Sequence, residues 1–87
     1  SLSEHLKIYP NPVSAKFFYV ELKIESEHPT MLELIDLNGH IIYQNQLLGE
    51  LSELKTHKIS TSTFPTGIYY LKITNASKVI SRKVFVN

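Results

Sequence analysis

Residues 17–24 read FFYVELKI, a stretch in which apolar and polar side chains alternate almost without exception. Successive side chains of a β-strand point to opposite faces of its sheet, so this pattern predicts one face turned to a core and the other to water. The core face would carry Phe18, Val20, Leu22 and Ile24, and the solvent face Tyr19, Glu21, Lys23 and Glu25. The stretch therefore predicts a half-buried strand.

Six further stretches with strand character are separated by turn residues, at about residues 5–9, 30–36, 40–48, 55–60, 68–74 and 78–86. We predict an all-β fold, a seven-stranded immunoglobulin-like antiparallel β-sandwich. It would form one domain over residues 1–87, with residues 1–5 as the remnant of a linker, because a chain of this length supports a single thin core.

Local details refine this prediction. Asn38-Gly39 is expected to form a two-residue hairpin turn in which both residues have positive φ. Ile41 and Ile42 are adjacent, so one of them must face outward or lie at a bulge. The strand at 55–60 is expected to be short and to form an edge. Tyr69 is expected to bond back to the turn before it, as a tyrosine does in immunoglobulin-like domains.

Composition excludes several classes of function. The formal net charge is +1, and the lysines and the single arginine are interpreted as dispersed among acidic residues, which argues against nucleic-acid binding. No apolar run approaches the roughly 20 residues of a membrane span, so membrane insertion is not expected. The chain has no cysteine and therefore no disulfide framework.

Residue types that carry catalysis or bind metals are scattered. The histidines are far apart in the sequence and are interpreted as surface residues: His5, His28, His40 and His57. Asp36 is the only aspartate, and it is expected to accept hydrogen bonds from backbone amides of the turn that follows it. The glutamates Glu21, Glu25, Glu27 and Glu33 read as solvent-facing. We predict no catalytic residues, no metal site and no cofactor, and hence no enzyme.

Four short segments, taken together, are more specific than any of these residues. They are Tyr9-Pro10-Asn11-Pro12, a turn from Asp36 to Gly39, the sequence Gly67-Ile68-Tyr69, and a basic-apolar run containing Arg82, Lys83, Val84 and Val86. In this order they resemble the type A C-terminal sorting domain of proteins exported by the type IX (Por) secretion system of Gram-negative bacteria. The resemblance covers nearly the whole chain.

This resemblance implies a function. The chain would be a secretion and sorting signal that directs a cargo protein through the type IX outer-membrane machinery and is then removed at the cell surface by a sortase-like peptidase. Its partners would be the outer-membrane translocon and its shuttle proteins, and its location the periplasm in transit, then the cell surface or the extracellular space. The domain itself would be a monomer.

An alternative is a generic immunoglobulin-like or fibronectin-like accessory module, with Tyr19 and Tyr43 as candidate sugar-stacking residues. A signal peptide and an unrelated large domain in the parent gene would favour sorting, and further domains after Asn87 would favour the accessory module.

The segments are also expected to differ in role. Gly67 and Tyr69 are expected to serve stability. The last strand, with Arg82 and Lys83 beside an apolar run, is expected to be the recognition element, because a terminal strand at a sheet edge offers unpaired backbone groups to a receptor strand. Val84 and Val86 would in addition complete the core.

Overall fold

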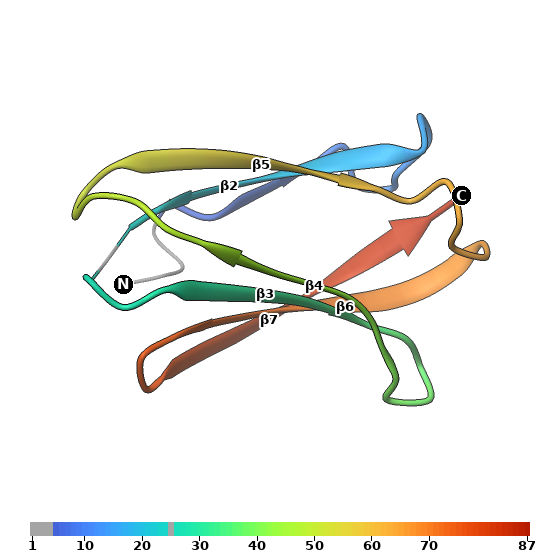
Figure 1. Cartoon of the computed structure of the whole chain (residues 1–87). Helices are drawn as coiled ribbons and strands as arrows, with labels where there is room; N and C mark the ends of the chain where they lie inside the picture. The colour runs from blue at the N-terminus through green and yellow to red at the C-terminus, as the bar shows by residue number, and fades with distance from the viewer. Residues whose placement is uncertain (1–4, 25) are drawn as a thin grey trace.

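Two antiparallel sheets pack face to face in a computed structural model that describes residues 5–24 and 26–87 (Figure 1). One sheet has the strand order β1-β2-β5 and the other β4-β3-β6-β7. The strands are β1 (Lys7–Tyr9), β2 (Phe17–Lys23), β3 (Thr30–Ile35), β4 (Ile41–Leu47), β5 (Leu54–Ser60), β6 (Gly67–Asn75) and β7 (Lys78–Val86). The predicted all-β immunoglobulin-like sandwich is confirmed. Of the expected linker, residues 1–4 lie outside the described residues, as does Glu25 of the predicted solvent face.

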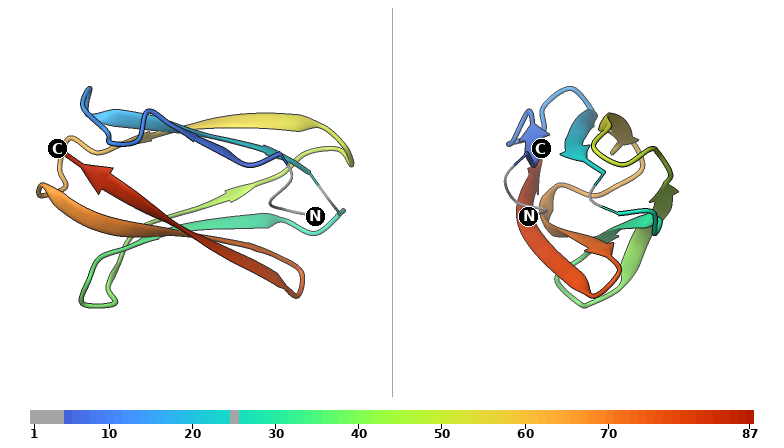
Figure 2. Two further views of the ribbon diagram at one scale, coloured as in Figure 1. Left: turned by 180° about the vertical axis from the view of Figure 1, so that it is seen from behind. Right: turned by 90° about the vertical axis from the view of Figure 1, so that its left-hand side faces the viewer.

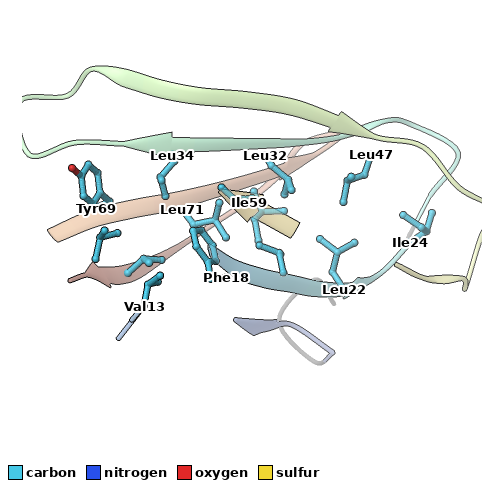
Figure 3. Close-up of a cluster of buried hydrophobic side chains, with 14 residues drawn as sticks. Val13, Phe18, Leu22, Ile24, Leu32, Leu34, Leu47, Ile59, Tyr69 and Leu71 are labelled. Atoms are coloured by element: carbon cyan, nitrogen blue, oxygen red, sulfur yellow. The ribbon is translucent and has the colours of Figure 1, made fainter. Parts of the chain in front are cut away.

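The core lies between the sheets and is made by alternate residues of their inner faces (Figure 3). In β2, the predicted core residues Phe18, Val20 and Leu22 are at most 1% exposed. From the opposite sheet they meet Leu32, Leu34, Tyr69, Leu71, Ile73, Val84 and Val86. Burial of a large apolar side chain contributes about 1.5–3 kcal/mol, so this double layer is the main source of stability.

The turn between β3 and β4 differs from the predicted one. Gly39 has φ 86°, but Asn38 is not at positive φ. The N–H of Gly39 donates to the carbonyl of Asp36 at 3.0 Å, and the N–H of Asp36 donates to the carbonyl of His40 at 3.0 Å. The loop therefore contains three residues, Leu37 to Gly39, with glycine alone in the left-handed region. The prediction of a two-residue turn is wrong because a neighbouring bulge takes up the extra residue.

That bulge lies where the adjacent isoleucines are. Ile41 pairs with Ile35, whereas Tyr43 pairs with Leu34, so the register shifts and Ile42 has no partner of its own. Ile41 is 53% exposed, and Ile42 packs against the core. The expectation of a bulge or an outward isoleucine is confirmed.

The edges formed by β4 and β5 are joined by side chains. The Tyr43 hydroxyl lies 2.6 Å from Nε2 of His57, and Nδ2 of Asn45 lies 3.2 Å from the same nitrogen. Burial lowers the pKa of His57, which favours a neutral ring whose Nε2 can accept a hydrogen bond from the hydroxyl. His57 is thus a half-buried residue between sheets and not the surface histidine that was predicted. β5 is an edge strand, as predicted, but with seven residues it is as long as β2.

The connection into β6 is held by Tyr69. Its ring is 5% exposed, and its hydroxyl donates to the carbonyl of Pro65 in the turn before the strand. This matches the predicted bond back to the turn. Because the carbonyl of Pro65 belongs to a connection without strand pairing, the hydroxyl fixes the path by which the chain enters β6.

We expect Tyr69→Phe to lower the free energy of unfolding by about 1 kcal/mol, because a partly buried hydrogen bond is lost while the ring remains. Tyr70→Phe is the matched control, since Tyr70 is the next residue and faces solvent with 38% exposure. That change should stay within about 0.5 kcal/mol of the wild type. Urea denaturation of both variants measures the difference. Equal midpoints would contradict the role given to the Tyr69 hydroxyl.

Candidate recognition surface

The four family-like segments, distant in sequence, meet at one end of the sandwich. Gly67 lies opposite Val86, and Tyr69 lies opposite Val84, where β6 begins and β7 ends. Ile35, directly before the Asp36 turn, lies opposite Tyr70. This is the end at which Figure 1 marks the C-terminus. The antiparallel sheet order β3-β6-β7 thus brings the last three segments together.

The first segment reaches this end by crossing between the sheets. We call residues Asn11–Val13 the strap; it follows β1 of the three-stranded sheet and lies beside the tip of β7 (Figure 2, left). The N–H of Val13 donates to the carbonyl of Phe85 at 2.7 Å, and the N–H of Asn87 donates to the carbonyl of Val13 at 3.0 Å. Val13 forms a parallel bridge with Val86 and is fully buried. The strap therefore continues the four-stranded sheet beyond β7.

The side chain of Asn11 extends this pairing by one position. Its Nδ2 donates to the carbonyl of Lys83 at 3.0 Å, and its Oδ1 accepts the N–H of Phe85 at 3.0 Å. A carboxamide has the same donor and acceptor as a peptide group, so it can take the place of a strand residue. Pro10 and Pro12, which have no N–H to offer, flank it without leaving a donor unpaired. Both proline peptide bonds, after Tyr9 and after Asn11, are cis.

These bonds change the predicted picture of the last strand. The carbonyls of Lys83 and Phe85 and the N–H groups of Phe85 and Asn87 are bonded to the strap. The expectation that this end of the strand offers unpaired backbone groups is therefore wrong. The reason is a pairing between the two ends of the chain, which local sequence patterns cannot reveal.

The side chains near the end of β7 form two sets, one buried and one exposed. Val84 and Val86 are 0% and 2% exposed and complete the core, as expected. Lys83 and Phe85 lie on the outer face, where Phe85 is 42% exposed and Nζ of Lys83 lies 5.9 Å from its ring centroid. Arg82 is exposed, and its Nη1 donates to the carbonyl of Ser81 at 3.1 Å. The side chains open to a partner are thus a cation and an aromatic ring, with a second cation nearby.

The Asp36 turn serves structure. The carboxylate oxygen Oδ1 accepts the N–H groups of Asn38 and His40, each at 2.9 Å, as predicted. The N–H of His40 is the largest cause that lowers the pKa of Asp36; the N–H of Asn38 and the His40 ring lower it further, while desolvation opposes them. A carboxylate with a lowered pKa stabilises the fold above the ordinary pKa of aspartate, and this contribution is lost as pH falls through the lowered value.

Gly67 has a weaker structural requirement than Gly39. Its φ of 159° borders the extended region, and a Cβ built on it would have no heavy atom within 4 Å. The stability role expected for Gly67 stays a prediction.

The two tyrosines considered for sugar stacking contact neighbouring side chains and are only partly exposed. The Tyr43 hydroxyl bonds His57, and Tyr19 packs between Tyr9 and Phe17 with ring centroids 5.5 Å from each.

Within residues 5–24 and 26–87, no three histidine, aspartate or glutamate side chains gather as a metal site. Over the same residues, no helix has the length and apolar character needed to cross a membrane.

The sequence did not predict that Val13 is buried and paired with Val86, or that the carboxamide of Asn11 pairs with β7 in the place of a backbone peptide group. The one available signal was an apolar residue directly after the Asn11-Pro12 pair.

Comparison with known proteins gives one match, to a protein family. The family model described as "Secretion system C-terminal sorting domain" matches residues 7–87, which is nearly the entire chain. The match begins at the first residue of β1 and includes the strap and all of β7. No curated protein matches the chain.

We expect Asn11→Asp to lower the free energy of unfolding by about 1 kcal/mol, because the Lys83 carbonyl would then face a carboxylate oxygen in place of a donor. Ser14→Asp is the control for added charge, since Ser14 is exposed and lies just beyond the strap. That variant should stay within about 0.5 kcal/mol of wild type. Chemical denaturation at neutral pH tests both. Equal losses in the two variants would mean that charge, and not the lost donor, weakens the fold.

Proposed function

The chain belongs to the family of secretion system C-terminal sorting domains, and we propose that it directs its cargo protein through the type IX outer-membrane machinery. A signal of this type implies export to the cell surface or the extracellular space. In the proposed sequence of events, the cargo crosses the inner membrane by an ordinary signal and folds in the periplasm. The translocon and its shuttle proteins then read this domain. A sortase-like peptidase cuts at or before the first residues.

The observation that carries this proposal is the convergence of the family segments on one end of the sandwich. The strap, the Asp36 turn, the start of β6 and the end of β7 come from four parts of the chain and lie together there. A partner that reads a folded domain can therefore contact segments from distant parts of the chain by binding at this one end. Lys83 and Phe85 are the side chains of this region that combine a charge with an exposed aromatic ring, and aromatic rings are enriched at protein interfaces.

The division of β7 into buried and exposed side chains decides which variants are informative. Removal of Phe85 to Asn87 would delete the core residue Val86 and the partners of Val13, so loss of export could reflect loss of folding. Lys83→Ala with Phe85→Ala leaves the core intact. A matched control exists on the other sheet, where Nζ of Lys58 lies 4.4 Å from the ring centroid of Phe17.

The test fuses the domain to the C-terminus of a periplasmic reporter in a host with a working type IX system. We expect the wild-type fusion and the Phe17→Ala, Lys58→Ala control to be exported. The Lys83→Ala, Phe85→Ala fusion should remain in the periplasm while its melting temperature stays close to that of the control. A wild-type fusion that stays in the periplasm would contradict the proposed function. Equal export of both double variants would exclude Lys83 and Phe85 as the signal.

A further inference from the structure

The free edge of β7 has two unlike halves. The strap occupies the half from Lys83 to Asn87. Along the half from Lys78 to Arg82, β6 is the only described strand whose Cα trace comes within 8 Å. This second half is therefore an open sheet edge within residues 5–24 and 26–87.

The backbone groups exposed there follow from the regular register. The N–H and carbonyl of Phe85 point away from β6, since both are bonded to the strap. The pairing of β7 with β6 is unbroken from Val86 back to Lys78. Because backbone groups alternate in direction along an antiparallel strand, Val79 and Ser81 must point outward as Phe85 does. Val79 presents its N–H and its carbonyl, and Ser81 presents its N–H, at the spacing of a strand, while the Ser81 carbonyl accepts a hydrogen bond from Arg82.

We propose that an extended, acidic segment of a partner protein adds to β7 along Lys78–Arg82 as a further strand. This proposal rests on the proposed function and identifies the chemistry of the partner that would read the domain. Strand addition uses backbone hydrogen bonds for affinity and side chains for specificity.

Charge indicates the acidic partner. All the aspartates and glutamates of the chain lie before Leu54, whereas residues 54–87 contain six of its nine lysines and arginines. The interpretation that cations are dispersed among acids is therefore wrong for this part of the chain. β7 carries Lys78, Arg82 and Lys83 and no carboxylate, whereas Lys72 of the neighbouring strand β6 lies opposite Glu33 of β3. Such an edge repels a second copy of itself, as charged edge strands do, and attracts a carboxylate-bearing strand.

Arg82 and Val79 are suited to such a partner. The guanidinium of Arg82 covers the outward carbonyl of Ser81 at 3.1 Å, and the side chain is exposed. A carboxylate of the incoming strand can bind this guanidinium through two parallel hydrogen bonds and release the carbonyl for a backbone N–H. Val79, 57% exposed, offers an apolar contact on the outer face.

The strap is a precedent for addition at this edge. It pairs with β7 in parallel and shows that the strand accepts a neighbour on this side. A lipid surface would match the positive charge but has no alternating N–H and carbonyl groups to pair with Val79 and Ser81. A peptide strand therefore accounts for more of the observed features.

The first experiment follows the amide signals of the 87-residue chain by NMR at low salt. The probe is a peptide of about eight residues with alternating valine and glutamate, long enough to span the open half at ~3.3 Å per residue. We expect shifts centred on Val79 and Ser81 and slower exchange of their N–H groups. Lysine-for-glutamate and fully N-methylated peptides should give neither. Lys78→Glu with Arg82→Glu should weaken binding roughly tenfold, while Lys23→Glu with Lys58→Glu, the same charge change on the other sheet, should change it less than about twofold.

Shifts centred elsewhere, or equal binding of the N-methylated peptide, would overturn the proposal. Shifts at Val79 and Ser81 with phosphatidylglycerol vesicles but not with the peptide would identify a lipid contact instead and would also overturn it.

Export separates this inference from the proposed function. The Lys78→Glu, Arg82→Glu reporter fusion should be exported less than the Lys23→Glu, Lys58→Glu fusion. If the wild-type fusion is not exported, the proposed function fails whatever the peptides do. If it is exported while no acidic peptide binds at β7, the inference alone fails.

Discussion

The pairing of the strap with the end of β7 is the constraint on which the structure of this end of the sandwich depends. Val13 is fully buried and bonded to Phe85 and Asn87, and Asn11 bonds Lys83 and Phe85 through its carboxamide. Without these bonds, the last residues of the strand would have only β6 as a partner. The strap joins the first and last family segments into one unit and also links the two sheets, since it follows β1. On the opposite side, the Tyr43–His57 hydrogen bond links β4 to β5.

This arrangement separates roles that overlap in the sequence. Val84 and Val86 belong to the core, and the backbone around Phe85 belongs to the strap. The outer side chains of Lys83 and Phe85 and the open backbone between Lys78 and Arg82 are left for a partner. A partner that binds here reads features which exist only in the folded domain, because the open edge and the outer face are products of strand pairing. The three cations of β7, Lys78, Arg82 and Lys83, give its edge one sign of charge.

Alternation in the sequence was enough to predict the strands, because a half-buried strand imposes period two on its side chains. Phe18, Val20 and Leu22 are the clearest case, and the bulge at Ile41 and Ile42 follows from a break in the same period. The hydrogen bonds of Asp36 and Tyr69 could be predicted for a different reason, because each side chain bonds to a backbone group only a few residues away in the sequence. The strap and the half-buried His57 were not, because each depends on contacts between segments that only the assembled sheets bring together. The prediction for the turn at Asn38 failed in a smaller respect, because a bulge next to the turn makes the loop three residues long and not two.

The most direct test of this account is amide hydrogen exchange along β7 in the wild-type chain. The N–H groups of Val13 and Phe85 are bonded across the edge, so they should exchange slowly, at rates similar to that of Val84 in the core. Val79 and Ser81, which point outward in the open half, should exchange far faster. Fast exchange at Val13 and Phe85, or uniform protection along the whole strand, would contradict the division of the edge into a closed half and an open half.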